Sequence, residues 1–141
     1  MVFNNGLPEI TKPMVANLCV KNHISRMDIE SNNGGDYYAK EVDEQIKNQG
    51  GNTSIRTFFT SSNKITKIIT ESDFVKKNFI FLHKSKQDTQ YKRFMQNLFS
   101  FTVTGKAKHD DAPDAVAMLS QLFKELSTLS IKFIDRKFLP F

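Results

Sequence analysis

The sequence of 141 residues has few of the features that define several large protein classes. Its single cysteine, Cys19, excludes an internal disulfide and a cysteine-rich zinc site. No apolar run approaches the roughly 18 residues that a membrane-spanning helix needs. The first residues lack the charged and apolar regions of a signal peptide, and no Gly-rich phosphate-binding motif occurs. These absences predict a protein of a reducing cytoplasm that neither enters a membrane nor binds ATP phosphates.

The residues that are present predict one domain with a basic surface. Hydrophobic residues make up 39% of the chain and include 13 Phe, which is enough for a single core at this length. The formal net charge is +5. An excess of Lys and Arg suits a polyanion such as DNA, although it equally describes a mildly basic protein with no such partner.

Hydrophobic spacing and turn residues predict that strands alternate with helices. Strands are expected at 2–3, 26–30, 53–59 and 79–82. Helices are expected at 13–21, 36–48, 63–77, 89–102 and 112–126, the first of them capped by Thr11 with Pro13 in its first turn. In the helix at 63–77, Ile69 is predicted to point inward, and Lys64, Lys67 and Lys76 outward. The alternation predicts a layered α/β domain.

Three acids, Asp110, Asp111 and Asp114, crowd the start of the last predicted helix. A structural interpretation places Asp111 at the N-cap and Asp114 at the third helical position, where acids satisfy free backbone N–H groups. Three acids exceed what capping requires. Because Asp111 and Asp114 are three residues apart, they share one side of the helix. Together they could bind a hard cation such as Mg²⁺ or Mn²⁺.

Glu30 ends a predicted strand, and in open α/β sheets sites form at the carboxyl ends of strands. Alternation places Glu30 on the opposite face from Ile29, so it need not enter the core. The Ser-Asn-Asn-Gly-Gly turn at 31–35 leaves room beside the carboxylate for an ion or a phosphate. The alternative interpretation is an ordinary solvated glutamate at a strand end.

The two acidic segments together resemble a known family. Glu-Ser-Asn-Asn-Gly-Gly at 30–35, followed by Lys-His-Asp-Asp-Ala-Pro-Asp-Ala at 108–115, is similar to the nuclease domain of phage terminase large subunits. The segments at 53–56 and 62–65 resemble the same family in order and spacing, as does the basic, aromatic ending at 136–141. The resemblance covers nearly the whole chain.

The resemblance implies a ribonuclease H-like layered sheet with flanking helices that lacks the first β-hairpin. Residues 1–127 would be the C-terminal portion of the nuclease domain and 128–141 a C-terminal extension. The implied activity is a two-metal endonuclease that cuts concatemeric viral DNA during head filling, with two Mg²⁺ or Mn²⁺ ions clamping the scissile phosphate. The implied partners are double-stranded DNA, the terminase ATPase domain, the small terminase subunit and the portal, at the packaging motor in the host cytoplasm.

The resemblance also implies roles for single residues. Glu30 matches the second acid of the family, and Asp111 or Asp114 matches the acid of the C-terminal helix. Asp110 or His109 would be a further metal ligand, a phosphate contact or a hydrogen-bond partner of a ligand, and His109 is weighted toward the last role. The family's first acid is expected upstream of Val2, and no Asp precedes Asp28.

Basic residues near these acids are candidates for DNA binding. Lys106 and Lys108 flank the acidic segment. The other candidates for a phosphate-facing surface are Arg56, Lys64, Lys67, Lys76 and Lys77. Contacts to the backbone alone would give a steep salt dependence and little sequence preference. The alternative is that these side chains form ordinary solvated helix faces.

Three hypotheses for the function follow. The first is a nuclease of the packaging motor. The second is a non-catalytic DNA-binding or motor-docking module whose acids only cap a helix. The third is another ribonuclease H-like enzyme, such as a resolvase or an integrase, which the residues around Glu30 favour less.

Overall fold

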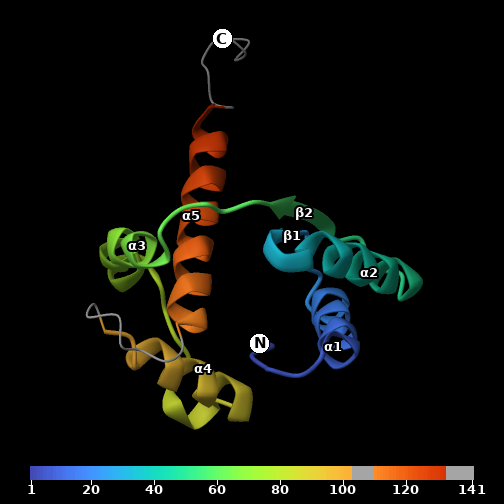
Figure 1. Ribbon diagram of the computed structural model, residues 1–141, viewed down its shortest axis with the longest axis horizontal. Coiled ribbons are helices and arrows are strands. Elements are labelled where there is room, and N and C mark those ends of the chain that lie inside the picture. Colours follow the sequence, from blue (N-terminus) through green and yellow to red (C-terminus); the bar gives the residue numbers. More distant parts are fainter. Residues whose placement is uncertain (103–109, 133–141) are drawn as a thin grey trace, which may run out of the picture. The chain divides into compact units, whose positions relative to one another are not determined.

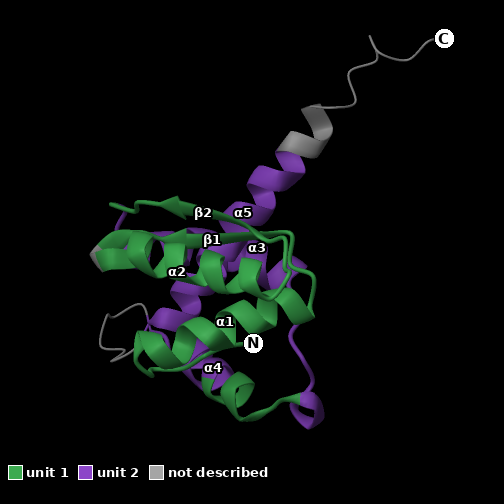
Figure 2. Cartoon of the chain, turned by 90° about the vertical axis from the view of Figure 1, so that its right-hand side faces the viewer, with its two compact units in different colours: residues 1–61, 87–93 green, residues 62–86, 94–141 purple. Residues whose placement is uncertain are grey.

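A computed structural model describes residues 1–102 and 110–132 of the chain. The elements follow one another in the order α1 (Pro8–Lys21), β1 (Arg26–Glu30), η1 (Asn32–Gly34), α2 (Gly35–Asn48), β2 (Ser54–Phe58), α3 (Lys64–Asn78), η2 (Lys84–Lys86), α4 (Thr89–Phe99) and α5 (Asp111–Lys132) (Figure 1). The fold is mixed α/β, as the sequence predicts. The chain divides into two compact units, residues 1–61 with 87–93 and residues 62–86 with 94–141 (Figure 2).

The first unit is built on a β-α-β arrangement. Strands β1 and β2 are parallel, with Met27 opposite Ile55. Parallel neighbours cannot be joined by a tight turn, and α2 forms the crossover between them. Met27 and Ile55 lie on one face of the strands and pack against a core that α1 and α2 supply. The buried members of this core are Ala16, Cys19, Val42 and Ile46.

The predicted elements of this unit are largely confirmed. Strand β1 has the predicted bounds, and α2 ends before Gly50, whose φ of +74° suits a residue without a side chain. The predicted start of the first helix was wrong. Helix α1 begins at Pro8, and Leu7 rather than Thr11 precedes it. A proline is tolerated at the first helical position because its missing N–H would have no partner there.

In the second unit, α3 packs against α5. Lys64 and Lys67 at the start of α3 pair with acids at the start of α5, whereas Glu71, one turn later, pairs with Lys124 far along α5. The two helices therefore run in the same direction. The buried apolar residues of this unit come from three helices: Ile68 from α3, Phe94 and Met95 from α4, and Ala112, Val116 and Ala117 from α5.

Several sequence predictions were wrong. Residues 2–3 and 79–82 are not strands, and Ile80 is 98% exposed. Lys67 points inward rather than outward and is buried, whereas Ile69, predicted to point inward, is 45% exposed. Helix α5 continues to Lys132, past the predicted end at 126. Within the described ranges, no helix is long and apolar enough to cross a membrane.

Candidate metal centre

Glu30 lies at the carboxyl end of β1, as the sequence predicts. The side-chain amide of Asn32 donates one hydrogen bond to Glu30 Oε1 (2.7 Å) and another to the carbonyl of Thr60 (2.9 Å). The backbone N–H of Ser31 donates to the carbonyl of Phe58 at 2.8 Å, which extends the strand pairing by one residue. The turn after β1 therefore orients the carboxylate instead of leaving it as a loose surface group.

A cleft of about 470 Å³ opens beside Glu30. Its walls come from the start of α1, the end of β1 and the turn into α2, and they include Pro8, Glu9, Lys12, Ile29, Asn32, Gly34, Gly35, Tyr37 and Tyr38. Lys12 brings a positive charge to this cleft and forms an ion pair with Glu41. The hydrogen bond from Lys12 lowers the pKa of the Glu41 carboxyl. The space beside Glu30 that the glycine-rich turn predicts is therefore present.

Gly35 makes this turn possible because α2 starts directly against the end of β1. A Cβ atom at Gly35 would lie 1.9 Å from the backbone oxygen of Glu30, which cannot rotate away. We expect Gly35→Ala to lower the free energy of unfolding by about 3 kcal/mol, at the upper end of overpacking costs. Urea denaturation followed by circular dichroism measures this change.

Gly50→Ala is the matched control for that substitution. Gly50 has positive φ, but a Cβ atom there would meet no other atom within 4 Å among the described residues, so only the backbone conformation opposes alanine. That conformation costs about 1–2 kcal/mol. Equal losses in the two variants would contradict the close contact at Gly35.

Asp110, Asp111 and Asp114 gather at the start of α5. Asp111 is the first helical residue rather than the N-cap that the sequence predicts, and the carbonyl of Asp110 accepts the N–H of Asp114 at 3.0 Å. The N–H of Ala112, which has no partner within the first turn of α5, donates to the side-chain oxygen of Asn97 on α4 at 2.8 Å. Capping by Asn97 leaves the three carboxylates available for other contacts.

Two lysines of α3 supply positive charge to these carboxylates. Lys64 Nζ lies 2.9 Å from Asp110 Oδ1, 3.7 Å from Asp111 Oδ1 and 3.7 Å from Asp114 Oδ2. Lys67 Nζ lies 2.6 Å from Asp114 Oδ1. Partial burial opposes the charge of Lys64, but the hydrogen bond to Asp110 outweighs it and raises the pKa of the ammonium. The ammonium of Lys64 therefore neutralises part of the charge of the acidic cluster.

The candidate DNA-binding residues have different surroundings. Lys67 has a side chain only 3% exposed, so it cannot face a phosphate in this position. Lys64 is 41% exposed but is engaged with the acids. Arg56 lies on β2, exposed, opposite Asp28 in the strand register, and Lys76 and Lys77 are exposed on α3. Lys106, Lys108 and His109 lie outside the described residues.

The acids that the sequence singles out therefore fall into two sets. Asp110, Asp111 and Asp114 are brought together in the second unit, and Glu30 belongs to the first. Among the residues described, no three acidic, His or Cys side chains approach closely enough to hold a metal ion as they stand. The three aspartates instead stand at ion-pair distances around the ammonium of Lys64.

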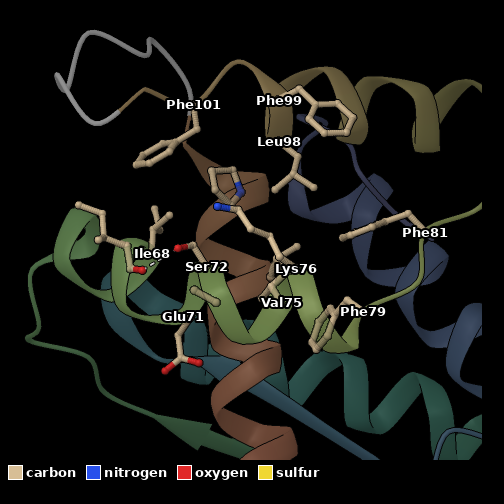
Figure 3. A pocket seen from close by; sticks show the side chains of 14 residues that line it. Ile68, Glu71, Ser72, Val75, Lys76, Phe79, Phe81, Leu98, Phe99 and Phe101 are labelled. Carbon is tan, nitrogen blue, oxygen red and sulfur yellow. Dashed lines mark hydrogen bonds between the residues drawn. The ribbon is translucent and has the colours of Figure 1, made fainter.

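A separate apolar cavity of about 490 Å³ lies in the second unit between α3, α4, α5 and the segment after α3 (Figure 3). Phe79, Phe81, Phe99 and Phe101 are part of its wall, and Ser72 and Lys76 are among its few polar side chains. None of the predicted acids lines it. The phenylalanines at 79 and 81, expected in a buried strand, instead face this cavity.

Glu71, which the sequence did not single out, is a buried acid at the edge of that cavity. Ser120 Oγ donates to Glu71 Oε2 at 2.5 Å, and Lys124 Nζ donates to the same oxygen at 2.7 Å. Burial opposes ionisation, but these hydrogen bonds outweigh it and hold the pKa of Glu71 below its ordinary value. These contacts of Glu71 fix α3 against α5, one turn of α3 beyond Lys67.

We expect Glu71→Gln to lower the free energy of unfolding at pH 7 by about 2 kcal/mol, the usual value of hydrogen bonds to a charged group. Because the folded pKa is depressed, this contribution is complete above the ordinary value of 4.5 and is lost as the pH falls through the folded value. Urea denaturation at pH 7 and at pH 3 tests both points. A difference between the two proteins that does not shrink at pH 3 would contradict this assignment.

Comparison with known proteins found no relative of this chain: no family model, no curated protein and no solved structure matches it.

Proposed function

We propose that this chain is part of a metal-dependent DNA endonuclease, the ribonuclease H-like nuclease of a phage DNA-packaging terminase. The observation that carries the proposal is the convergence of three carboxylates at the start of α5 on a single cationic position, that of Lys64 Nζ. Three carboxylates around one point form a hard oxygen donor set of the kind that Mg²⁺ and Mn²⁺ prefer.

Glu30 supports the same proposal from the other unit. It ends a strand of a parallel β-α-β arrangement, and it borders a cleft with room for an ion or a phosphate. Its carboxylate is held by Asn32 through one oxygen, Oε1. The proposal assigns a metal-binding role to Glu30 as well as to the α5 acids, so each of them is required for activity. This requirement gives the proposal a sharp test in the substitution of Glu30.

The residues have distinct roles in this proposal. Asp111, with a side chain 72% exposed, is the acid best able to reach an ion, and Asp110 is the second. Asp114 is 9% exposed and paired with Lys67, so it positions the start of α5 as well as contributing charge. Two bound ions would supply an activated hydroxide and stabilise the leaving 3′ oxygen. Double-stranded DNA is the proposed substrate, and the ATPase domain, small subunit and portal are the proposed partners.

A second candidate function is a non-catalytic DNA-binding or motor-docking module. The ion pairs of Lys64 and Lys67 favour it, since a cluster that is already neutralised has a purely structural explanation. Mn²⁺-dependent nicking of a supercoiled plasmid separates the two candidates. The nuclease converts the plasmid to open-circular and linear forms, whereas a binding module retards it on a gel without cutting it.

A further inference from the structure

Lys64 Nζ stands at the point where the carboxylates of Asp110, Asp111 and Asp114 converge, 2.9, 3.7 and 3.7 Å from the nearest oxygen of each. A cation is therefore already bound among these oxygens, and that cation is an ammonium of the chain itself. The contacts are longer than the roughly 2.0–2.1 Å of a Mg²⁺–oxygen bond. A divalent ion and this ammonium cannot occupy the point together.

The two lysines of the cluster differ in their freedom to move. The side chain of Lys67 is 3% exposed and is enclosed between α3 and α5, whereas that of Lys64 is 41% exposed. Lys64 is also the first residue of α3, so its departure breaks no packing within the helix. Burial therefore selects Lys64 as the cation that can leave and Lys67 as the one that stays.

Asp114 has acceptor capacity left over in this arrangement. Its side chain is 9% exposed, and the 2.6 Å contact of its Oδ1 with Lys67 Nζ lacks the alignment of a hydrogen bond. In the part of the chain that is described, neither atom has another hydrogen-bond partner. The two atoms are paired with each other, and the second oxygen of Asp114, Oδ2, lies 3.7 Å from Lys64 Nζ, beyond hydrogen-bond distance.

We propose that the ammonium of Lys64 occupies the metal position among the α5 carboxylates and must leave it before a divalent ion binds there. The inference rests on the proposed nuclease function. In the metal-free chain, Lys64 keeps the three like charges together. When the ion enters, the exposed lysine is released beside the site, where its ammonium can contact a DNA phosphate.

Mn²⁺ titration of the full chain, followed by electron paramagnetic resonance, tests the competition. Lys64→Met removes the competing charge and keeps the length of the side chain. We expect it to bind Mn²⁺ about tenfold more tightly than the wild type, which corresponds to the loss of a few modest ion pairs. Lys124→Met is the matched control, because Lys124 pairs with Glu71 away from the cluster, and its Mn²⁺ affinity should equal that of the wild type.

The outcomes separate the inference from the function. Equal Mn²⁺ affinity in wild type and Lys64→Met overturns the competition and leaves the nuclease proposal standing. Absence of Mn²⁺ binding in both overturns the inference and the metal-dependent function together. If Lys64→Met does not fold, NMR of ¹³C-methylated lysines in the wild type decides instead. Mg²⁺ should then shift the Lys64 resonance and leave that of Lys124 in place, and an unshifted Lys64 overturns the inference.

Discussion

Replacement of Asp114 by alanine lowers the free energy of unfolding by about 3–5 kcal/mol, the cost of removing one partner of a buried ion pair. Asp114 Oδ1 lies 2.6 Å from Lys67 Nζ, and the two side chains are 9% and 3% exposed. Alanine takes away the carboxylate and leaves an ammonium enclosed between α3 and α5. The measurement is urea denaturation at pH 7, followed by circular dichroism.

Two further variants test the origin of this loss. Asp111→Ala, at a position 72% exposed, should change stability by no more than about 0.5 kcal/mol, as surface substitutions usually do. The double variant Lys67→Met, Asp114→Leu removes both charges and should recover most of the loss, since apolar residues often replace a buried pair at little cost. A loss below about 1 kcal/mol in Asp114→Ala would contradict the buried pair.

The stability role of Asp114 affects how activity data on the α5 acids are interpreted. Loss of nuclease activity in an Asp114 variant can follow from unfolding of the start of α5. Asp111 is exposed, so a loss of activity in Asp111→Asn reports on the proposed chemistry itself. The pair of variants therefore separates an acid with a structural role from one that is proposed to bind metal, within the first turn of the same helix.

The second large effect is expected at Glu30. We predict that Glu30→Gln lowers the rate of Mn²⁺-dependent plasmid nicking by about 100-fold or more, because even residues that only support a metal ligand cost 10–100-fold when they are replaced. Glutamine keeps the shape of the side chain and an oxygen for the Asn32 hydrogen bond. The substitution therefore removes charge at the proposed site while leaving the turn after β1 in place.

Glu9→Gln is the matched control for this experiment. Glu9 lines the same cleft as Glu30 and is exposed, so its replacement changes the charge of the cleft by the same amount. We expect nicking by Glu9→Gln to equal that of the wild type. A comparable loss in both variants would show that the net charge of the cleft, and not Glu30 as a ligand, determines the rate.

The elements that the sequence predicts well are those specified by local signals. Strand β1 alternates apolar and polar residues, α2 repeats apolar residues every four positions up to Gly50, and α3 begins where Asn63 caps it by accepting the N–H of Thr66. Residues 79–82 show the limit of such signals. A short apolar run fits a buried strand or any other apolar contact, and here its phenylalanines face a cavity.

For the candidate site, the sequence predicts the positions of the acids but not their partners. The gathering of acids at the start of α5 and the position of Glu30 at a strand end follow from local pattern and are present. The partners of those acids do not follow from it. Lys64 meets Asp110 from 46 positions away along the chain, and Asn97 caps α5 from another helix. Helical periodicity also predicts that Lys67 points outward, because lysine is usually solvated. Its buried ion-pair partner, Asp114, lies on another helix and is not visible in the local sequence.

The proposed nuclease function is tested by Mn²⁺-dependent nicking of supercoiled plasmid by the full chain, with Glu30→Gln and Asp111→Asn measured beside it. If the chain is the proposed nuclease, the wild type nicks the plasmid only when Mn²⁺ is present, and each substitution removes the activity while the protein stays folded. Nicking that survives both substitutions, or a folded wild type that does not nick at all, would contradict it.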